Sequence, residues 1–144
     1  MNVLIVEDDE AIAGLLYADL SDEGYRCTCV YNGREAADLL EKCMDFDFVL
    51  LDIMLPEVNG YELLEYIKPM GIPVIFLTAK GAVRDRIQGL KMGADDYIVK
   101  PFSSGEVIAR MEAVLRRYGK NGKELSFANV TLDLESRRVC RGGV

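Results

Sequence analysis

The sequence contains no histidine and only four cysteines among its 144 residues. The lack of histidine removes a common general base and any phosphohistidine donor within the chain. The cysteines have no zinc-binding spacing, and Cys27 and Cys29 share one face of a strand-like stretch, where they cannot easily form a disulfide. We therefore interpret Cys27, Cys29, Cys43 and Cys140 as reduced thiols, mostly packing groups, of a cytoplasmic protein.

Long hydrophobic runs are also missing. No apolar run approaches a membrane span, and acidic residues follow the first run too closely for a secretory signal, so we expect no membrane contact. Positive charge is scarce through Tyr118, where 12 Lys and Arg oppose 21 Asp and Glu, a net charge of −9. From Gly119 onward 5 oppose 3, a net charge of +2. The charge of the first part makes it a poor binder of nucleic acid.

Short apolar runs alternate with helical patterns through residue 118. The strand-like runs are Val3–Val6, Cys27–Val30, Phe48–Leu51, Val74–Leu77 and Tyr97–Val99. Apolar residues at helical spacing follow each run, at Ile12–Leu20, Ala36–Leu40, Tyr61–Ile67, Val83–Met92 and Val107–Leu115. Asn32 is a suitable helix cap, and Gly24 and Gly93 are suitable helix stops. This alternation predicts an α/β fold with a doubly wound five-stranded parallel sheet.

The character of the chain changes after Tyr118. Residues 119–123 form a short polar linker, and residues 124–144 partly alternate apolar and polar side chains, which predicts two or three short strands. A stretch of this length cannot bury a core alone. We expect one domain over residues 1–118 and the β-rich beginning of a second domain over residues 124–144.

Four of the apolar runs stop at a polar residue. The stops are Glu7-Asp8-Asp9, Asp52, Thr78 and Lys100-Pro101. Because ligands of open α/β sheets bind beyond the carboxyl ends of the strands, these side chains are expected to share one site. Adjacent carboxylates repel unless a cation offsets them, and a few oxygen ligands suit Mg²⁺. The alternative is that the acids merely cap the following helix.

Asp52 is the candidate nucleophile of this site. A carboxylate can attack phosphorus to form an acyl phosphate, provided that a neighbouring cation offsets its charge. Thr78 offers a hydroxyl to a phosphoryl oxygen, and Lys100 offers a positive charge, which a cis bond to Pro101 would aim inward. Taken singly, these residues also fit a turn aspartate, a strand-end threonine and a solvated lysine.

These motifs together resemble the receiver domain of two-component response regulators. The resemblance rests on V-E-D-D at 6–9, L-L-D-I-M-L-P at 50–56, P-V-I-F-L-T-A-K at 73–80, G-A-D-D-Y at 93–97 and K-P-F at 100–102. It covers residues 1–118 and implies a flavodoxin-like, CheY-like fold. The segment from Gly93 to Phe102 and the residues after Tyr118 are similar to the winged-helix OmpR/PhoB branch, whose DNA-binding domain follows the receiver.

The resemblance implies a role for each site residue. Asp52 would accept a phosphoryl group from a histidine kinase. The Mg²⁺ ligands would be Asp8, Asp52 and the backbone carbonyl of Met54, with Glu7 acting through a bound water. The phosphate-binding and switch residues would be Thr78, Ala79, Lys100 and Tyr97. Tyr97 would turn inward as Thr78 moves toward the phosphate.

The resemblance also implies a homodimer that forms on phosphorylation, through the fourth helix, fifth strand and fifth helix. An apolar patch would come from Ile87, Leu90 and Ile108. Ion pairs between subunits would join Arg86 with Glu106 and Asp96 with Arg110. A third pair of the family would use Asp95, but its partner position here is the acidic Glu112, with Arg116 one turn later.

The resulting hypothesis is a transcriptional regulator, not an enzyme, that binds DNA through the domain following the receiver. A stand-alone receiver acting by protein contact is the alternative. An aspartyl-nucleophile phosphatase would carry an aspartate where Met54 stands, and the acidic cluster at 7–10 would repel the phosphate of a flavodoxin-like cofactor binder. The partner kinase, the stimulus and the target promoters do not follow from the sequence.

Overall fold

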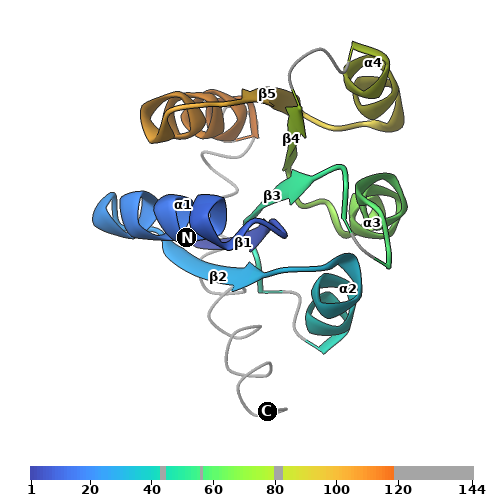
Figure 1. Cartoon of the computed structure of the whole chain (residues 1–144), viewed down its shortest axis with the longest axis horizontal. Helices are drawn as coiled ribbons and strands as arrows, with labels where there is room; N and C mark the ends of the chain where they lie inside the picture. The colour runs from blue at the N-terminus through green and yellow to red at the C-terminus, as the bar shows by residue number, and fades with distance from the viewer. Residues whose placement is uncertain (43–44, 56, 80–82, 119–144) are drawn as a thin grey trace.

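Five strands alternate with helices in the computed structural model, which describes residues 1–42, 45–55, 57–79 and 83–118, with only the backbone at 83–86 and 89 (Figure 1). The elements are β1 (Asn2–Val6), α1 (Glu10–Asp22), β2 (Arg26–Val30), α2 (Gly33–Lys42), β3 (Phe48–Asp52), α3 (Gly60–Ile67), the 3-10 helix η1 (Lys68–Met70), β4 (Val74–Ala79), α4 (Val83–Met92) and β5 (Asp96–Lys100). A further helix covers 104–118. The alternation is as predicted, with strands one or two residues longer than expected.

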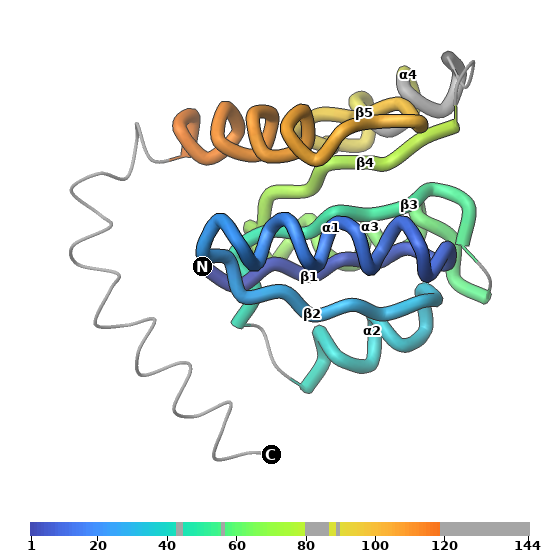
Figure 2. Tube along the Cα trace, turned by 60° about the vertical axis from the view of Figure 1, so that its left-hand side comes forward, coloured from blue at the N-terminus to red at the C-terminus, as the bar shows by residue number. Residues whose placement is uncertain are grey.

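All neighbouring strands are parallel, in the order β2-β1-β3-β4-β5. The chain moves outward from β1 to β2 and then returns across β3, β4 and β5, so the order reverses between β1 and β3. Helix α1 and the helix 104–118 (orange in Figure 2) cover one face of the sheet, while α2, α3 and α4 cover the other. The predicted doubly wound five-stranded sheet is confirmed.

Each face of the sheet has its own hydrophobic core. On the α1 face, Leu16 and Leu20 of α1 meet Val107 and Met111 of the helix 104–118 over alternate residues of the inner strands. On the other face, α2 and α3 pack on the remaining strand residues. All five residues of β3 are buried, as expected for a central strand covered on both sides. Each fully buried Leu or Val stabilises the fold by about 1.5–3 kcal/mol.

The helix ends follow the expected local chemistry. The Asn32 side chain accepts a hydrogen bond from the Glu35 backbone N–H at 2.8 Å and donates one to the Glu35 carboxylate at 3.0 Å, which caps α2 from both directions. Gly24 and Gly93 follow α1 and α4 with φ of 95° and 107°, which favours glycine. The predicted cap and both stops are confirmed.

One apolar residue is more exposed than the helical pattern suggests, and some of the predicted features lie outside the residues that the structure describes. Leu15 belongs to the apolar pattern of α1, yet half of its surface is exposed, because Leu16 and Leu20 turn their side of the helix to the sheet. Cys43, Cys140 and residues 119–144 lie outside the described residues; Cys27 and Cys29 are free thiols. Within the described part of the chain, no helix combines the length and apolar character that crossing a membrane requires.

Candidate functional site

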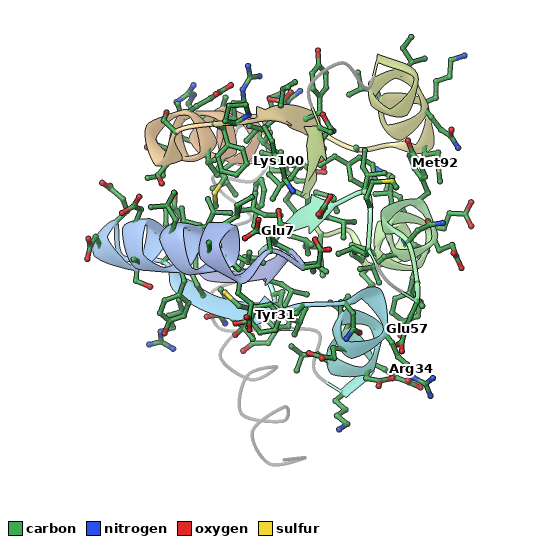
Figure 3. All side chains as sticks on the ribbon, in the orientation of Figure 1. Glu7, Tyr31, Arg34, Glu57, Met92 and Lys100 are labelled. Atoms are coloured by element: carbon green, nitrogen blue, oxygen red, sulfur yellow. The ribbon has the colours of Figure 1, made fainter. Side chains whose placement is uncertain are left out.

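The polar strand ends converge at one edge of the sheet. Asp52 ends β3 and pairs with Leu77, next to Thr78 of β4, while Lys100 ends β5 opposite Ala79. Glu7 directly follows β1, the other neighbour of β3 in the sheet. Glu7 and Lys100 are labelled in Figure 3. Residues that are far apart in the sequence therefore meet because parallel strands bring their carboxyl ends to the same edge.

Three carboxylates gather at this edge. One oxygen from each of Glu7, Asp8 and Asp52 lies within 4.8 Å of the others. Glu7 and Asp52 are buried, and Asp8 is exposed. Asp9 does not join them: its side chain accepts hydrogen bonds from the N–H groups of Ala11 and Ile12, at 3.0 and 3.2 Å, and so caps α1. The helix-capping alternative therefore describes Asp9, and not Glu7 or Asp8.

Lys100 reaches both buried carboxylates. Its Nζ lies 2.7 Å from Glu7 Oε1, as an ion pair without hydrogen-bond alignment, and donates a hydrogen bond of 3.2 Å to Asp52 Oδ2. The Lys100–Pro101 peptide bond is cis, as the sequence suggested. Asp52 Oδ1 accepts a hydrogen bond of 3.1 Å from the Met54 N–H, so both oxygens of this carboxylate have a donor.

Burial and crowding shift the titration of all three groups. Burial, reinforced by the nearby Asp52 carboxylate and opposed by Lys100, raises the pKa of Glu7 from 4.5 to about 7. Burial also raises the pKa of Asp52, although Lys100 and the Met54 N–H oppose the rise. For Lys100, burial lowers the pKa, but the two carboxylates outweigh it and the net shift is upward. Two buried acids thus share one ammonium group.

This donor set fits a small divalent cation. All three ligand candidates are carboxylates, which Mg²⁺ prefers, and one lysine leaves the pair of buried acids with an excess of negative charge. Asp8 lies on the exposed side, where an ion with several waters can enter. Met54, two residues after Asp52, has an exposed side chain, and its backbone N–H already holds the Asp52 carboxylate.

Two of the predicted switch residues, Thr78 and Ala79, lie beside this cluster, and Tyr97 does not. Thr78 is buried, and its hydroxyl donates a hydrogen bond of 3.4 Å to the Ala79 carbonyl. Ala79 is exposed at the end of β4, where it pairs with Lys100. Tyr97 is half-buried and packs against the core on the α2 and α3 face. The structure thus places Thr78 and Ala79 next to Lys100 and places Tyr97 on a different face of β5.

The predicted dimer face has exposed apolar residues and ion pairs that close within the chain. Ile87 and Leu90 are about half exposed, whereas Ile108 is partly buried against the α1-face core. Arg110 lies 3.2 Å from both Asp96 and Glu106 of its own chain. The side chain of Arg86 lies outside the described residues.

Asp95 has partners that the sequence did not indicate. Its Oδ1 accepts a hydrogen bond of 2.9 Å from the Tyr118 hydroxyl, and its Oδ2 accepts one of 2.9 Å from the Val74 N–H. Burial, then the hydrogen bond and charge of Asp95, raise the pKa of Tyr118 to about 12. Burial raises the pKa of the Tyr25 phenol, and the nearby carboxylate of Glu112, which stands where the resembled family has a basic residue, raises it further.

The geometry defines a receiver-type domain, and comparison with known proteins agrees. The family model for the response regulator receiver domain matches residues 3–112, and the chain belongs to that family. The chain is 38% identical over 144 residues to the transcriptional regulatory protein PcoR of Escherichia coli. This match covers 98% of the chain and 63% of PcoR. It is 39% identical over 147 residues to the transcriptional regulatory protein CusR of Escherichia coli strain K12, covering 99% of this chain and 64% of CusR.

Solved structures give the same fold. The receiver domain of the Francisella response regulator 1452 is 34% identical, with a TM-score of 0.73, and the match covers 81% of this chain and 98% of that domain. The predicted assignment to response regulator receivers of the OmpR/PhoB branch is confirmed, and the chain is homologous to transcriptional regulators of two-component systems. It spans 63% of the length of PcoR and 64% of that of CusR.

Proposed function

We propose that Asp52 accepts a phosphoryl group from a histidine kinase and that this modification switches the domain. The arrangement of Asp52 carries the proposal. Its carboxylate is buried at the end of a central strand, held by Lys100 and the Met54 N–H, and lies within reach of two further acids. A nucleophile needs this orientation, and a transferred phosphoryl group needs the neighbouring cations.

The transfer step forms one bond and breaks one. An oxygen of the Asp52 carboxylate attacks the phosphorus of a phosphohistidine on the kinase, the new O–P bond forms, and the electron pair of the P–N bond returns to the imidazole. Asp8, Asp52 and the Met54 carbonyl would hold Mg²⁺, with Glu7 acting through a water. When bound, the ion neutralises negative charge on the phosphoryl oxygens. Lys100 stabilises the remaining oxygen charge.

Phosphorylation then replaces the single negative charge of the Asp52 carboxylate with a phosphoryl group that carries a charge of about −1.5 to −2. Lys100 exchanges its contact with Glu7 and Asp52 for the phosphate, and the Thr78 hydroxyl turns from the Ala79 carbonyl to a phosphoryl oxygen. The space that Thr78 leaves favours the inward arrangement of Tyr97. Because β5 carries both Lys100 and Tyr97, the change reaches α4, β5 and the helix 104–118.

The output of the switch is a homodimer that controls transcription in the cytoplasm. The exposed Ile87 and Leu90 supply its apolar contact, with Ile108 at the margin, and the charged residues of β5 and the helix 104–118 set its register. The DNA contact belongs to the complete C-terminal domain, which begins within 124–144 after a linker at 119–123. Names of the relatives support this role, since PcoR and CusR are called transcriptional regulatory proteins.

The decisive experiment uses acetyl phosphate with Mg²⁺ on the wild-type chain and on Asp52→Asn. We expect one phosphoryl group per wild-type chain and none on Asp52→Asn, measured by intact mass. Asp45→Asn, on the opposite edge of the sheet, is the matched control and should incorporate as the wild type does. Retained incorporation in Asp52→Asn would contradict the proposal. Light scattering with and without beryllofluoride tests the dimer, and an unchanged monomer would count against it.

A further inference from the structure

The described residues between β3 and α3, 53–55 and 57–59, include Met54 and directly follow Asp52; we call them the acceptor loop. Its first turn is fixed by the hydrogen bond from the Met54 N–H to Asp52 Oδ1, at 3.1 Å. Its end is fixed by a 2.9 Å hydrogen bond from the Gly60 N–H to the Ile53 carbonyl and by Asn59, which caps α3. The two ends of the acceptor loop are therefore tied to Asp52 and to the start of α3.

A residue from a different element supports the acceptor loop from outside. Gly33 is the buried first residue of α2, and a Cβ built there would overlap the Val58 carbonyl oxygen and lie 2.8 Å from two further Val58 atoms. The carbonyl is backbone and cannot rotate out of the way as a side chain could. Glu57 of the loop and Arg34, which follows Gly33, lie at the same corner of the molecule in Figure 3. Only glycine allows this approach of loop to helix.

The acceptor loop is also closely packed at its α3 end. On its inner side, a Cβ at Gly60 would lie 2.6 Å from the Asp52 carbonyl oxygen and from Ile53 Cα, so the loop closes tightly on itself. Glu57 already has a left-handed backbone, with φ of 69°, which is unfavourable for a residue with a side chain. Asn32 caps the start of α2 by accepting a hydrogen bond from the Glu35 N–H.

We propose that Gly33 is a positioning residue for the phosphoacceptor site. Because Gly33 has no side chain, the Val58 backbone can pack directly against the start of α2. This contact between Val58 and Gly33 keeps the Met54 carbonyl and the Asp52 carboxylate in the arrangement that binds Mg²⁺. The proposal rests on the proposed function for its metal. A side chain at position 33 pushes Val58 outward, and because Asn59 and Gly60 are fixed, the displacement passes to the part of the loop that carries Met54.

The test compares Gly33→Ala with Gly14→Ala. Both variants add one methyl group to a helical glycine, but a Cβ at Gly14 would meet no atom within 4 Å. Two quantities are measured by NMR on the whole chain: the amide resonance of Met54 without metal, and the Mg²⁺ dissociation constant from titration. We expect Gly33→Ala to shift the Met54 resonance and to weaken Mg²⁺ binding by about tenfold, as loss of outer support typically does. Gly14→Ala should match the wild type in both.

Three further outcomes decide the proposal. A Gly33→Ala protein that loses stability but keeps the wild-type Met54 resonance and Mg²⁺ affinity would overturn it. If Gly33→Ala does not fold, Val58→Gly weakens the contact between Val58 and Gly33 from the side of the loop. Unchanged Mg²⁺ affinity in that variant would also overturn the proposal. Failure of the proposed function has a different signature: Asp52→Asn would then bind Mg²⁺ as the wild type does, while the metal-free Met54 resonance would still report the effect of Gly33.

Discussion

Two clusters of the molecule have the same charges and opposite surroundings. At the strand ends, Lys100 lies between the carboxylates of Glu7 and Asp52, whose side chains are 0% and 7% exposed. On the outer face, Arg110 lies between Asp96 and Glu106, and the side chains of Arg110 and Glu106 are 42% and 41% exposed. In each cluster one basic group contacts two carboxylates, and the burial of those carboxylates is the main difference between the two.

The difference shows which cluster can act as a switch. Water screens the exposed cluster, and removal of one member leaves charges that solvent can satisfy. Water cannot solvate the charges of the buried cluster in this way. Burial raises the pKa of Glu7 to about 7, and one ammonium group contacts two carboxylates. A cation or a phosphoryl group changes that balance strongly, which is why perturbed groups at a strand edge indicate a functional site. Four measurements would sharpen or break this comparison.

The largest effect is expected for Lys100→Ala. Without its ammonium group, two buried carboxylates face each other, and the free energy of unfolding at pH 8 without Mg²⁺ should fall by about 3 to 4 kcal/mol. The protein should remain folded, since domains of this size have several kcal/mol to lose, but beryllofluoride should no longer change its assembly state. Urea unfolding and light scattering measure the two effects. Lys91→Ala, at an exposed position of α4, is the control; a Lys100→Ala protein that matched it would contradict the comparison.

The pH dependence of stability should reveal Glu7. Its pKa rises from 4.5 to about 7 on folding, so the native state binds more protons than the unfolded state in that window. The free energy of unfolding should therefore fall as pH rises through it, by about 3 kcal/mol for this group without Mg²⁺. Glu7→Gln should flatten that part of the curve, and Glu65→Gln, on the exposed side of α3, should not. Parallel curves for wild type and Glu7→Gln would refute the assigned burial effect.

The buried cluster was accessible from the sequence because its parts follow a simple rule. Each apolar run is a strand, and each polar stop marks a carboxyl end, so a parallel sheet brings Glu7, Asp52 and Lys100 to one edge. The same rule grouped Asp9 with its neighbours, although it caps α1, because adjacency along the chain does not say which way a side chain turns.

Other contacts could not be predicted from local patterns. The hydroxyl of Tyr118 reaches Asp95, 23 residues earlier in the chain, and the backbone of Val58 rests on Gly33. No periodicity encodes either contact, since both depend on how a loop or helix end packs against another element. Gly33 begins a helix that any small residue could begin, and only the close approach of the Val58 carbonyl oxygen requires glycine there.

Tyr118→Phe should have a smaller effect, because its contact with Asp95 lies at the surface. Loss of the hydroxyl removes a hydrogen bond of 2.9 Å to a carboxylate that keeps the Val74 N–H as its other donor. The expected loss is about 1 kcal/mol in the free energy of unfolding at pH 7. Tyr17→Phe, at an exposed tyrosine of α1, provides the control. Equal stability of the two variants would mean that the contact contributes nothing measurable.

The smallest effect is expected for the exposed cluster itself. A double-mutant cycle with Asp96→Asn and Arg110→Ala should give a coupling free energy of at most about 1 kcal/mol, and 0.5 M salt should reduce it further, as an estimate for exposed ion pairs. The same cycle with Glu7→Gln and Lys100→Ala should give a larger coupling that salt changes little, because Glu7 is buried and Lys100 is mostly so. If the two couplings proved equal, burial would not be what distinguishes the clusters, and the strand-end site would lose its special electrostatics.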